Sequence, residues 1–165
     1  MPDVLDAWRM IAARRRFEGR FPLADFARLR DSLEGAEGEA QAVFDFDRDS
    51  LRTPYVELRL RAQLPLVCQR SLQRFLFPVD IVQRLGLIRD EADEAALPPG
   101  YEPLLLADDG LLRPADLVED ELILALPVIP VAPGTEALDR QWSPASEEAA
   151  QANPFAALAA LKRNS

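Results

Sequence analysis

The strongest constraint on the fold is a long alternation of apolar and polar residues between positions 55 and 68. The even positions are all apolar, and they are Val56, Leu58, Leu60, Ala62, Leu64, Leu66 and Cys68. Successive side chains of a strand point to opposite faces, so the pattern predicts an antiparallel strand with one buried and one wet face. Pro65 falls on the wet phase, where we expect a bulge or a sheet edge.

A second alternation follows after a turn at residues 69–71, and it indicates a return strand. Its apolar positions are Phe75, Phe77, Val79 and Ile81. The two strands together predict a long hairpin. Upstream, Ala42, Phe44 and Phe46 alternate with less apolar neighbours and predict another strand, and residues 101–107 read as a short one.

Helical spacing of apolar residues predicts helices over residues 3–16, 22–33 and 114–126. Pro22 and Pro114 suit the first helical position of the second and third helices. We therefore expect an α+β fold in which an antiparallel sheet, built on the long hairpin, is packed by three helices.

The chain divides by composition into one domain and a tail. Residues 1–133 hold all the predicted sheet and its helices, whereas residues 134–152 are rich in Glu, Ala, Ser, Pro and Gln and predict a flexible acidic linker. A short helix is expected over 153–165, with Asn153 as its N-cap. Its apolar stripe is Phe155, Leu158 and Leu161, which we expect to dock either on the domain or on a partner.

Two absences bound the chemistry, because the 165 residues include no histidine and one cysteine, Cys68. Ser-His-Asp and Cys-His catalysis, histidine metal sites and an internal disulfide are therefore excluded. One thiolate cannot build a structural zinc site, so we expect no metal, no cofactor and no small-molecule substrate. Cys68 is expected to be a buried core residue, the alternative being a reactive thiol activated by Arg70. No apolar run reaches a membrane span and the acidic N-terminus has no signal sequence, so a cytoplasmic location is expected.

The net charge of −9 is unevenly distributed. Residues 1–89 carry 15 arginines and 13 carboxylates, whereas residues 90–165 carry 4 basic residues and 15 carboxylates. Because acidic surfaces repel phosphates, any RNA contact should come from the first half. The candidates for RNA or ribosome contact are Arg14, Arg15, Arg16, Phe17, Arg20, Arg59 and Arg61. The alternative for the Arg14–Arg16 cluster is a solvated helix end that complements the helix dipole.

Four acidic residues begin the third predicted helix: Asp116, Glu119, Asp120 and Glu121. They are candidates for docking a basic partner protein by electrostatic attraction. The alternative is that they complement the helix N-terminus and face solvent. A Mg²⁺ site is disfavoured, because such sites usually also need substrate phosphates.

Three stretches together resemble the YceD family, whose members are described as large ribosomal RNA subunit accumulation proteins. They are Tyr101-Glu102-Pro103, then residues 116–131 (DLVEDELILALPVIPV), then residues 153–162 (NPFAALAALK). The turn that begins at Cys68 also resembles the C-x-x-C turn of that family, but Ser71 and residues 131–134 stand where relatives carry further cysteines. A zinc site conceivable in relatives cannot form here from Cys68 alone.

The resemblance implies a role in the synthesis, processing or stability of 23S ribosomal RNA. We expect a non-enzymatic accessory factor that binds an assembly intermediate of the large subunit. The alternative is a protein–protein adaptor, which docks a basic ribosomal protein or a processing enzyme on the acidic half without touching RNA. A third and weaker hypothesis is a hydrolase that uses only carboxylates and arginines.

Overall fold

The computed structural model describes residues 2–135; residue 1 and residues 136–165 lie outside the described part. The expected helix over 153–165 and all but the first two residues of the expected linker fall in that undescribed region. A five-stranded sheet in the order β2-β3-β4-β5-β6 dominates the fold. Its strands are β2 (Arg16–Pro22), β3 (Glu39–Arg48), β4 (Pro54–Val67), β5 (Arg74–Ile88) and β6 (Glu102–Leu105).

The predicted hairpin forms the centre of this sheet. β4 and β5 pair antiparallel without interruption from Tyr55 opposite Gly86 to Val67 opposite Arg74. The even residues of β4 face the core, as their alternation predicted. No bulge occurs at Pro65, because the register does not slip there. Pro65 lies where β4 has passed the end of its pairing with β3, at Arg61 opposite Gln41, and its carbonyl accepts a hydrogen bond from the Glu34 amide (2.8 Å).

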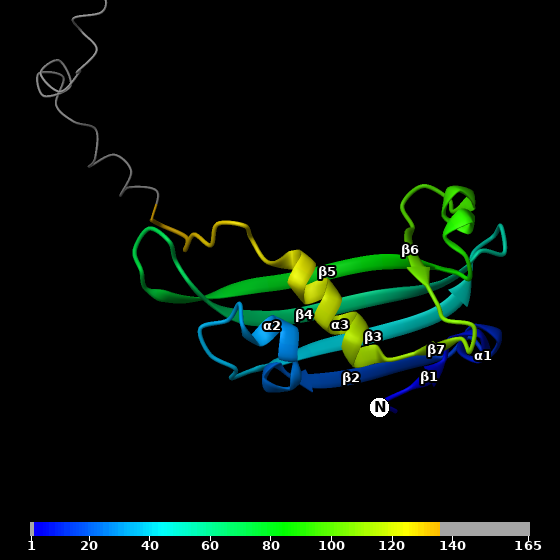
Figure 1. Cartoon of the computed structure of the whole chain (residues 1–165), viewed down its shortest axis with the longest axis horizontal. Helices are drawn as coiled ribbons and strands as arrows, with labels where there is room; N and C mark the ends of the chain where they lie inside the picture. The colour runs from blue at the N-terminus through cyan, green and yellow to red at the C-terminus, as the bar shows by residue number, and fades with distance from the viewer. Residues whose placement is uncertain (1, 136–165) are drawn as a thin grey trace, which may run out of the picture.

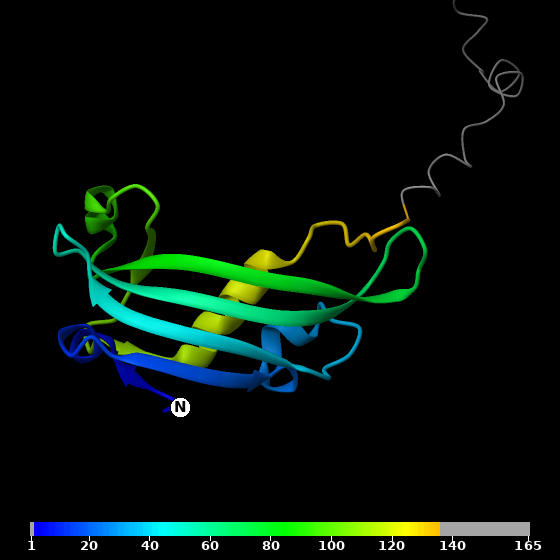
Figure 2. The same ribbon diagram turned by 180° about the vertical axis from the view of Figure 1, so that it is seen from behind.

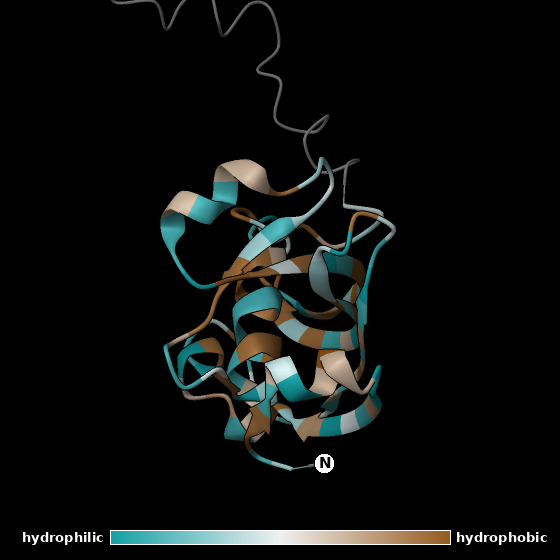
Figure 3. Ribbon diagram, turned by 90° about the vertical axis from the view of Figure 1, so that its right-hand side faces the viewer, coloured by the Kyte–Doolittle hydropathy of each residue, from teal (hydrophilic) through white to brown (hydrophobic). Residues whose placement is uncertain are grey.

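Helix α3 (Pro114–Ala125) covers one face of the sheet and crosses it diagonally (Figure 1). Seen from behind, the sheet lies in front of α3, and its other face carries no helix (Figure 2). The core lies between the two layers, where Phe44, Leu58 and Leu60 of the sheet and Val118 and Leu122 of α3 have no exposed surface. Apolar and polar residues alternate along the strands in Figure 3, so the uncovered face is polar.

The first two helices are shorter than predicted. Helix α1 spans only Ala7–Ala12, because Leu5–Asp6 (β1) pairs with Leu111–Leu112 (β7) and Arg16 already pairs with Asp45 in the sheet. The expected helix over 22–33 is replaced by a 3₁₀ turn at Leu23–Asp25 and α2 (Ala27–Arg30). Phe26 between them is extended and buried, so core packing overrides the local helical pattern.

The third predicted helix is confirmed as α3. The segment 89–100 contains a 3₁₀ helix over Glu91–Ala96, and β6 runs parallel to β5, so the sheet is mostly but not wholly antiparallel. The α+β class is therefore confirmed. Within the described residues, no helix is long and apolar enough to cross a membrane.

Candidate functional site

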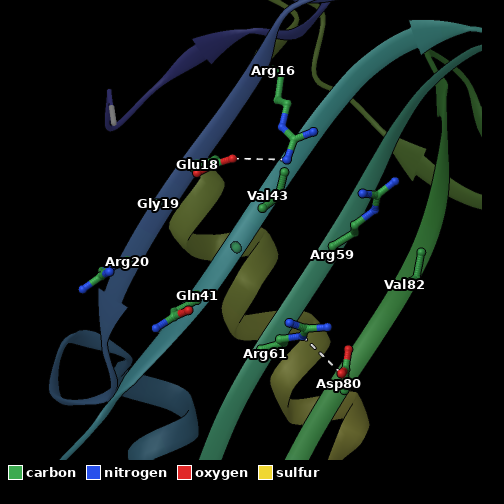
Figure 4. Close-up of a pocket in the computed structure, with 11 residues that line it drawn as sticks. Arg16, Glu18, Gly19, Arg20, Gln41, Val43, Arg59, Arg61, Asp80 and Val82 are labelled. Carbon is green, nitrogen blue, oxygen red and sulfur yellow. Dashed lines mark hydrogen bonds and ion pairs between the residues drawn. The ribbon is translucent and has the colours of Figure 1, made fainter.

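The uncovered face of the sheet brings together four of the seven residues predicted to contact RNA. Arg16 and Arg20 project from β2, and Arg59 and Arg61 project from β4 (Figure 4). They line a shallow hollow of about 470 Å³, whose floor includes Gly19, Ala42 and Val43. Antiparallel register produces this convergence, because odd residues of β4 and even residues of β2 point to the same side. We refer to this surface as the arginine face.

Every arginine of the hollow is paired with a carboxylate of the same face. Arg16 contacts Glu18 (3.2 Å) and Asp45 (3.7 Å), and Arg20 contacts Glu39 (3.5 Å). Arg59 contacts Glu57 (2.6 Å), and Arg61 contacts Asp80 of β5 (3.1 Å). The face is therefore a network of ion pairs with balanced charges and not a bare positive patch.

Glu57 is shared by two arginines of this ion-pair network. Its carboxylate accepts hydrogen bonds from Arg59 (2.6 and 3.1 Å) and from Arg84 of β5 (2.9 Å). These two guanidinium groups hold the pKa of Glu57 below its usual value, although partial burial opposes the shift. The Glu57 carboxylate is thus ionised at neutral pH and fixes both arginines upright on the sheet.

The other three RNA candidates lie at the start of β2 or before it. Arg14 occupies a left-handed turn (φ 48°) and pairs with Asp47 (3.2 Å), so it does not end a helix as predicted. The Arg15 guanidinium lies 5.9 Å from the centre of the Phe17 ring. Phe17 itself packs edge-on against Phe46 of the core, on the side of β2 away from the hollow.

An aromatic cluster that the sequence analysis did not single out borders the arginine face. Tyr55 and Tyr101 meet edge to face with ring centres 5.7 Å apart, and the Arg84 guanidinium lies 5.5 Å from the centre of the Tyr55 ring. The Tyr101 hydroxyl donates to Asp49 (3.1 Å). Tyr55 has the same strand phase as Arg59 and Arg61, so the sequence could have placed it on their face. Arg84 and Tyr101 come from other segments, and only the pairing of the strands brings them to Tyr55.

The predicted acidic surface of α3 divides into different environments. Glu119 is buried (7% exposed), and its carboxylate accepts from the backbone amides of Arg28 (2.7 Å) and Leu29 (3.0 Å) and from the Arg28 guanidinium (2.9 and 3.1 Å). Burial alone would raise the pKa of Glu119, but these hydrogen bonds outweigh it and lower the pKa. Glu119 therefore caps the first turn of α2 from another element. The alternative that it faces solvent is wrong.

Asp120 is exposed and shares Arg28 with Glu119 (2.6 Å), whereas Asp116 is exposed in the first turn of α3. Glu121 is 8% exposed, which also contradicts the solvent-facing alternative. Desolvation, together with the charges of Glu102 and Asp120, raises the pKa of Glu121. Within residues 2–135, no three Asp, Glu or Cys side chains lie close enough together to hold a metal ion.

Cys68 is fully buried, as predicted, at the tip of the β4–β5 hairpin. Its sulfur is more than an apolar filler, because it accepts hydrogen bonds from the backbone amides of Ala132 (3.3 Å) and Ser71 (3.5 Å). The Ala132 bond is the largest of the causes that lower the pKa of Cys68 to about 6. The predicted alternative assigned a lowered pKa to the Arg70 charge, whereas hydrogen bonds from backbone amides and from the Ser71 side chain lower the pKa of Cys68. Cys68 thus contacts Ser71 and Ala132, which belongs to the segment 131–134 where the resemblance implies a further cysteine in relatives.

Comparison with known proteins adds to this geometry. The family model described as "Large ribosomal RNA subunit accumulation protein YceD" matches residues 56–162. The chain belongs to the YceD family. One curated member, the large ribosomal RNA subunit accumulation protein YceD of Haemophilus influenzae, is 28% identical over 170 residues, covering 99% of this chain and 97% of that relative. No solved structure shows a significant match. The matched region contains Arg59, Arg61 and the whole of α3, whereas Arg16 and Arg20 precede it.

Proposed function

We propose that this chain supports the accumulation of large-subunit ribosomal RNA as a non-enzymatic factor, and that the arginine face is its RNA-contacting surface. The family name of its relatives supplies the process. The convergence of Arg16, Arg20, Arg59 and Arg61 on one hollow is the observation that carries the surface. Arginine suits this task because its planar fork matches the oxygens of a phosphate.

The ion pairs of Arg16, Arg20 and Arg61 are compatible with phosphate binding because both partners are at least partly exposed, whereas the Glu57 carboxylate that holds Arg59 is only 13% exposed. The side chains of Arg20 and Arg61 are 74% and 76% exposed, and those of Arg16 and Arg59 are 55% and 50% exposed. Exposed pairs contribute about 0–1 kcal/mol each, so a phosphate can take the place of a carboxylate at small cost. Tyr55 at the border of the face offers a ring for stacking on an unpaired base.

A second candidate function is the adaptor that docks a basic ribosomal protein or a processing enzyme without touching RNA. The net charge of −11 on residues 90–165 favours it, as does the exposed Asp116. Glu119 does not support it, because its carboxylate is committed to Arg28 and to α2. The two functions differ in one measurable property, which is binding of the purified protein to RNA.

The deciding experiment compares the tagged wild-type chain with Arg59→Gln/Arg61→Gln on sucrose gradients of its own cells. We expect the wild type to migrate with a large-subunit precursor and the double variant to move toward the top of the gradient. Arg30→Gln is the matched control, because Arg30 is exposed on α2, beside α3 and away from the arginine face. Unchanged migration of the double variant would rule out the arginine face as the contact.

Two further assays separate the alternatives. Purified protein should bind fragments of 23S ribosomal RNA with no other protein present, and failure to do so would favour the adaptor. Labelled precursor RNA incubated with the protein and Mg²⁺ should remain intact. Cleavage would instead establish the hydrolase hypothesis and contradict a non-enzymatic role.

A further inference from the structure

A second surface lies at the opposite edge of the sheet from β2, where β6, β7 and α3 surround a groove of about 360 Å³. Three of its large apolar side chains are exposed: Leu105 is 50% exposed, Leu111 is 48% exposed and Val4 is 37% exposed. Leu104 and Leu117 line the same groove. Three large apolar side chains exposed in one groove indicate a surface that a partner covers.

The groove is acidic as well as apolar. Asp109, Asp116 and Asp120 line it, and Arg113 is its one basic residue within the described chain. Asp120 is held by Arg28, and Asp109 accepts a hydrogen bond from the Leu111 amide (3.0 Å). An apolar floor with an anionic border complements a segment that carries both apolar and cationic side chains.

Backbone geometry specifies the form of that segment. β6 is the edge strand of the sheet and, within residues 2–135, pairs only with β5, through Leu85–Ile88 opposite Glu102–Leu105. Alternate backbone groups of an edge strand point away from the sheet and are available to another strand. The consecutive residues 104–107 all line the groove, so the groove follows the second half of β6 and the two residues after it.

We propose that this groove binds an extended cationic segment of a partner protein, which adds to β6 as a further strand. Its apolar side chains cover Leu105 and Leu111, and its lysines or arginines face Asp116 and Asp109. Strand addition supplies affinity through main-chain hydrogen bonds, and the alternating side chains supply selectivity. The three carboxylates of the groove repel RNA. A second copy of this chain is disfavoured by its net charge of −9.

This inference does not rest on the proposed RNA contact, because the groove and the arginine face share no residue. The test uses the full-length chain labelled with ¹⁵N and titrated with the acetylated, amidated peptide KVKLRVK. We expect amide shifts confined to residues 104–112 and the first turn of α3, and slower hydrogen exchange at the outward amides of β6. A glutamate-substituted peptide, EVELEVE, should not bind. The same peptide N-methylated at its third and fifth backbone nitrogens keeps every side chain, and it should bind at least about tenfold more weakly because it lacks two main-chain donors.

Variants of the protein localise the site. Asp116→Lys should weaken KVKLRVK binding about fivefold or more at low salt, and Leu105→Ser should weaken it about tenfold. The matched control Glu34→Lys makes the same charge change at an exposed position in the loop between α2 and β3, which does not line the groove, and should change the affinity less than twofold. Both groove positions are exposed, and unchanged amide spectra elsewhere will show that the variants are folded.

Five outcomes would overturn the inference. The first four are no binding of KVKLRVK at 100-fold molar excess, shifts that fall on the arginine face, groove shifts that change with protein concentration alone, and displacement of the peptide by RNA. Groove shifts in the free full-length chain that respond to substitutions within residues 136–165 would assign the groove to the chain's own tail and likewise overturn it. Because Arg59→Gln/Arg61→Gln leaves the groove intact, this peptide assay can fail while the RNA assay succeeds, and the reverse also holds.

Discussion

Replacing Asp80 with asparagine should strengthen RNA binding, because it frees a phosphate-binding arginine from its own carboxylate. Asp80 on β5 pairs with Arg61 on β4 across one step of the hairpin, with a separation of 3.1 Å. Removing any surface acid weakens the repulsion of RNA, so an increase in affinity points to Arg61 only if the increase is absent when Arg61 is also replaced.

The size of the effect follows from the exposure of the pair. Asp80 and Arg61 side chains are 65% and 76% exposed, so the pair itself contributes at most about 1 kcal/mol and the fold should lose less than that. A phosphate bound on the far side of the guanidinium would lie roughly 6 Å from the Asp80 carboxylate, which in water costs about 0.7 kcal/mol of repulsion. Because the pair is present both before and after such a phosphate binds, removing the repulsion should improve affinity by about 0.7 kcal/mol, or about threefold.

The assay is fluorescence anisotropy of labelled 23S ribosomal RNA fragments at several salt concentrations, with melting curves as the folding control. Asp80→Asn should also steepen the dependence of log K on log salt by up to about 0.7 for single-stranded RNA. Arg61→Gln should act in the opposite direction, and the double variant Asp80→Asn/Arg61→Gln should bind no better than Arg61→Gln. If Asp80→Asn weakens RNA binding or leaves the affinity within twofold of wild type, the arginine face is a network of ion pairs with no phosphate contact at Arg61. That result would refute the reasoning.

Three further predictions concern buried ionisable groups. Glu119→Ala should lower the free energy of unfolding by about 2 kcal/mol, because two helix amides lose their acceptor. The lowered pKa of Glu119 gives stability that is lost as pH falls below the ordinary value of 4.5. Melting curves of wild type and variant should therefore converge in acid. Glu121→Gln should instead raise the melting temperature by about 3 °C at pH 7, since desolvation raises the pKa of Glu121 and its ionised form opposes folding; an equal or lower melting temperature would contradict this assignment. Cys68→Ala should destabilise the chain more at pH 8.5 than at pH 5.5. A thiol whose pKa is lowered from 9.0 to about 6 contributes stability that is fully present above pH 9 and is lost as pH falls through 6. A pH-independent difference in urea midpoint would show that the thiol stays protonated.

The sheet was predictable to the extent that its strands carry the period of two. Apolar residues recur at every second position over 56–68 and 75–81, and these segments lie almost wholly within the two longest strands. The helices were overextended, because apolar spacing over residues 3–16 says nothing of partners distant in sequence. Leu5 pairs with Leu112 and Arg16 pairs with Asp45, and these long-range bonds end α1 at both sides. β6 was expected as a strand, but no local pattern in four residues reveals that it is parallel to β5.

The candidate site shows the same division between local and long-range information. Phase along a strand placed Arg59 and Arg61 on one face, and this required no knowledge of register. Their partners did require it, because Asp80 faces Arg61 only through the pairing of β4 with β5. Glu119 could not be distinguished from Asp116 in the sequence, because the Arg28 that it binds is 91 positions away. Acidic residues of one helix can thus have opposite roles, and only the packing of α2 on α3 separates them.

Charge balance on the arginine face has a consequence for how such a factor would work. A bare cluster of arginines binds any RNA, because phosphate neutralisation carries no sequence information. Here each arginine already pairs with a carboxylate that repels an incoming phosphate, so one or two contacts yield little free energy. A useful affinity then requires several phosphates to reach Arg16, Arg20, Arg59 and Arg61 together, which a folded RNA surface achieves more readily than a flexible strand. The proposed face would therefore select RNA by shape and release it when that shape changes during assembly, as weak and simultaneous contacts allow.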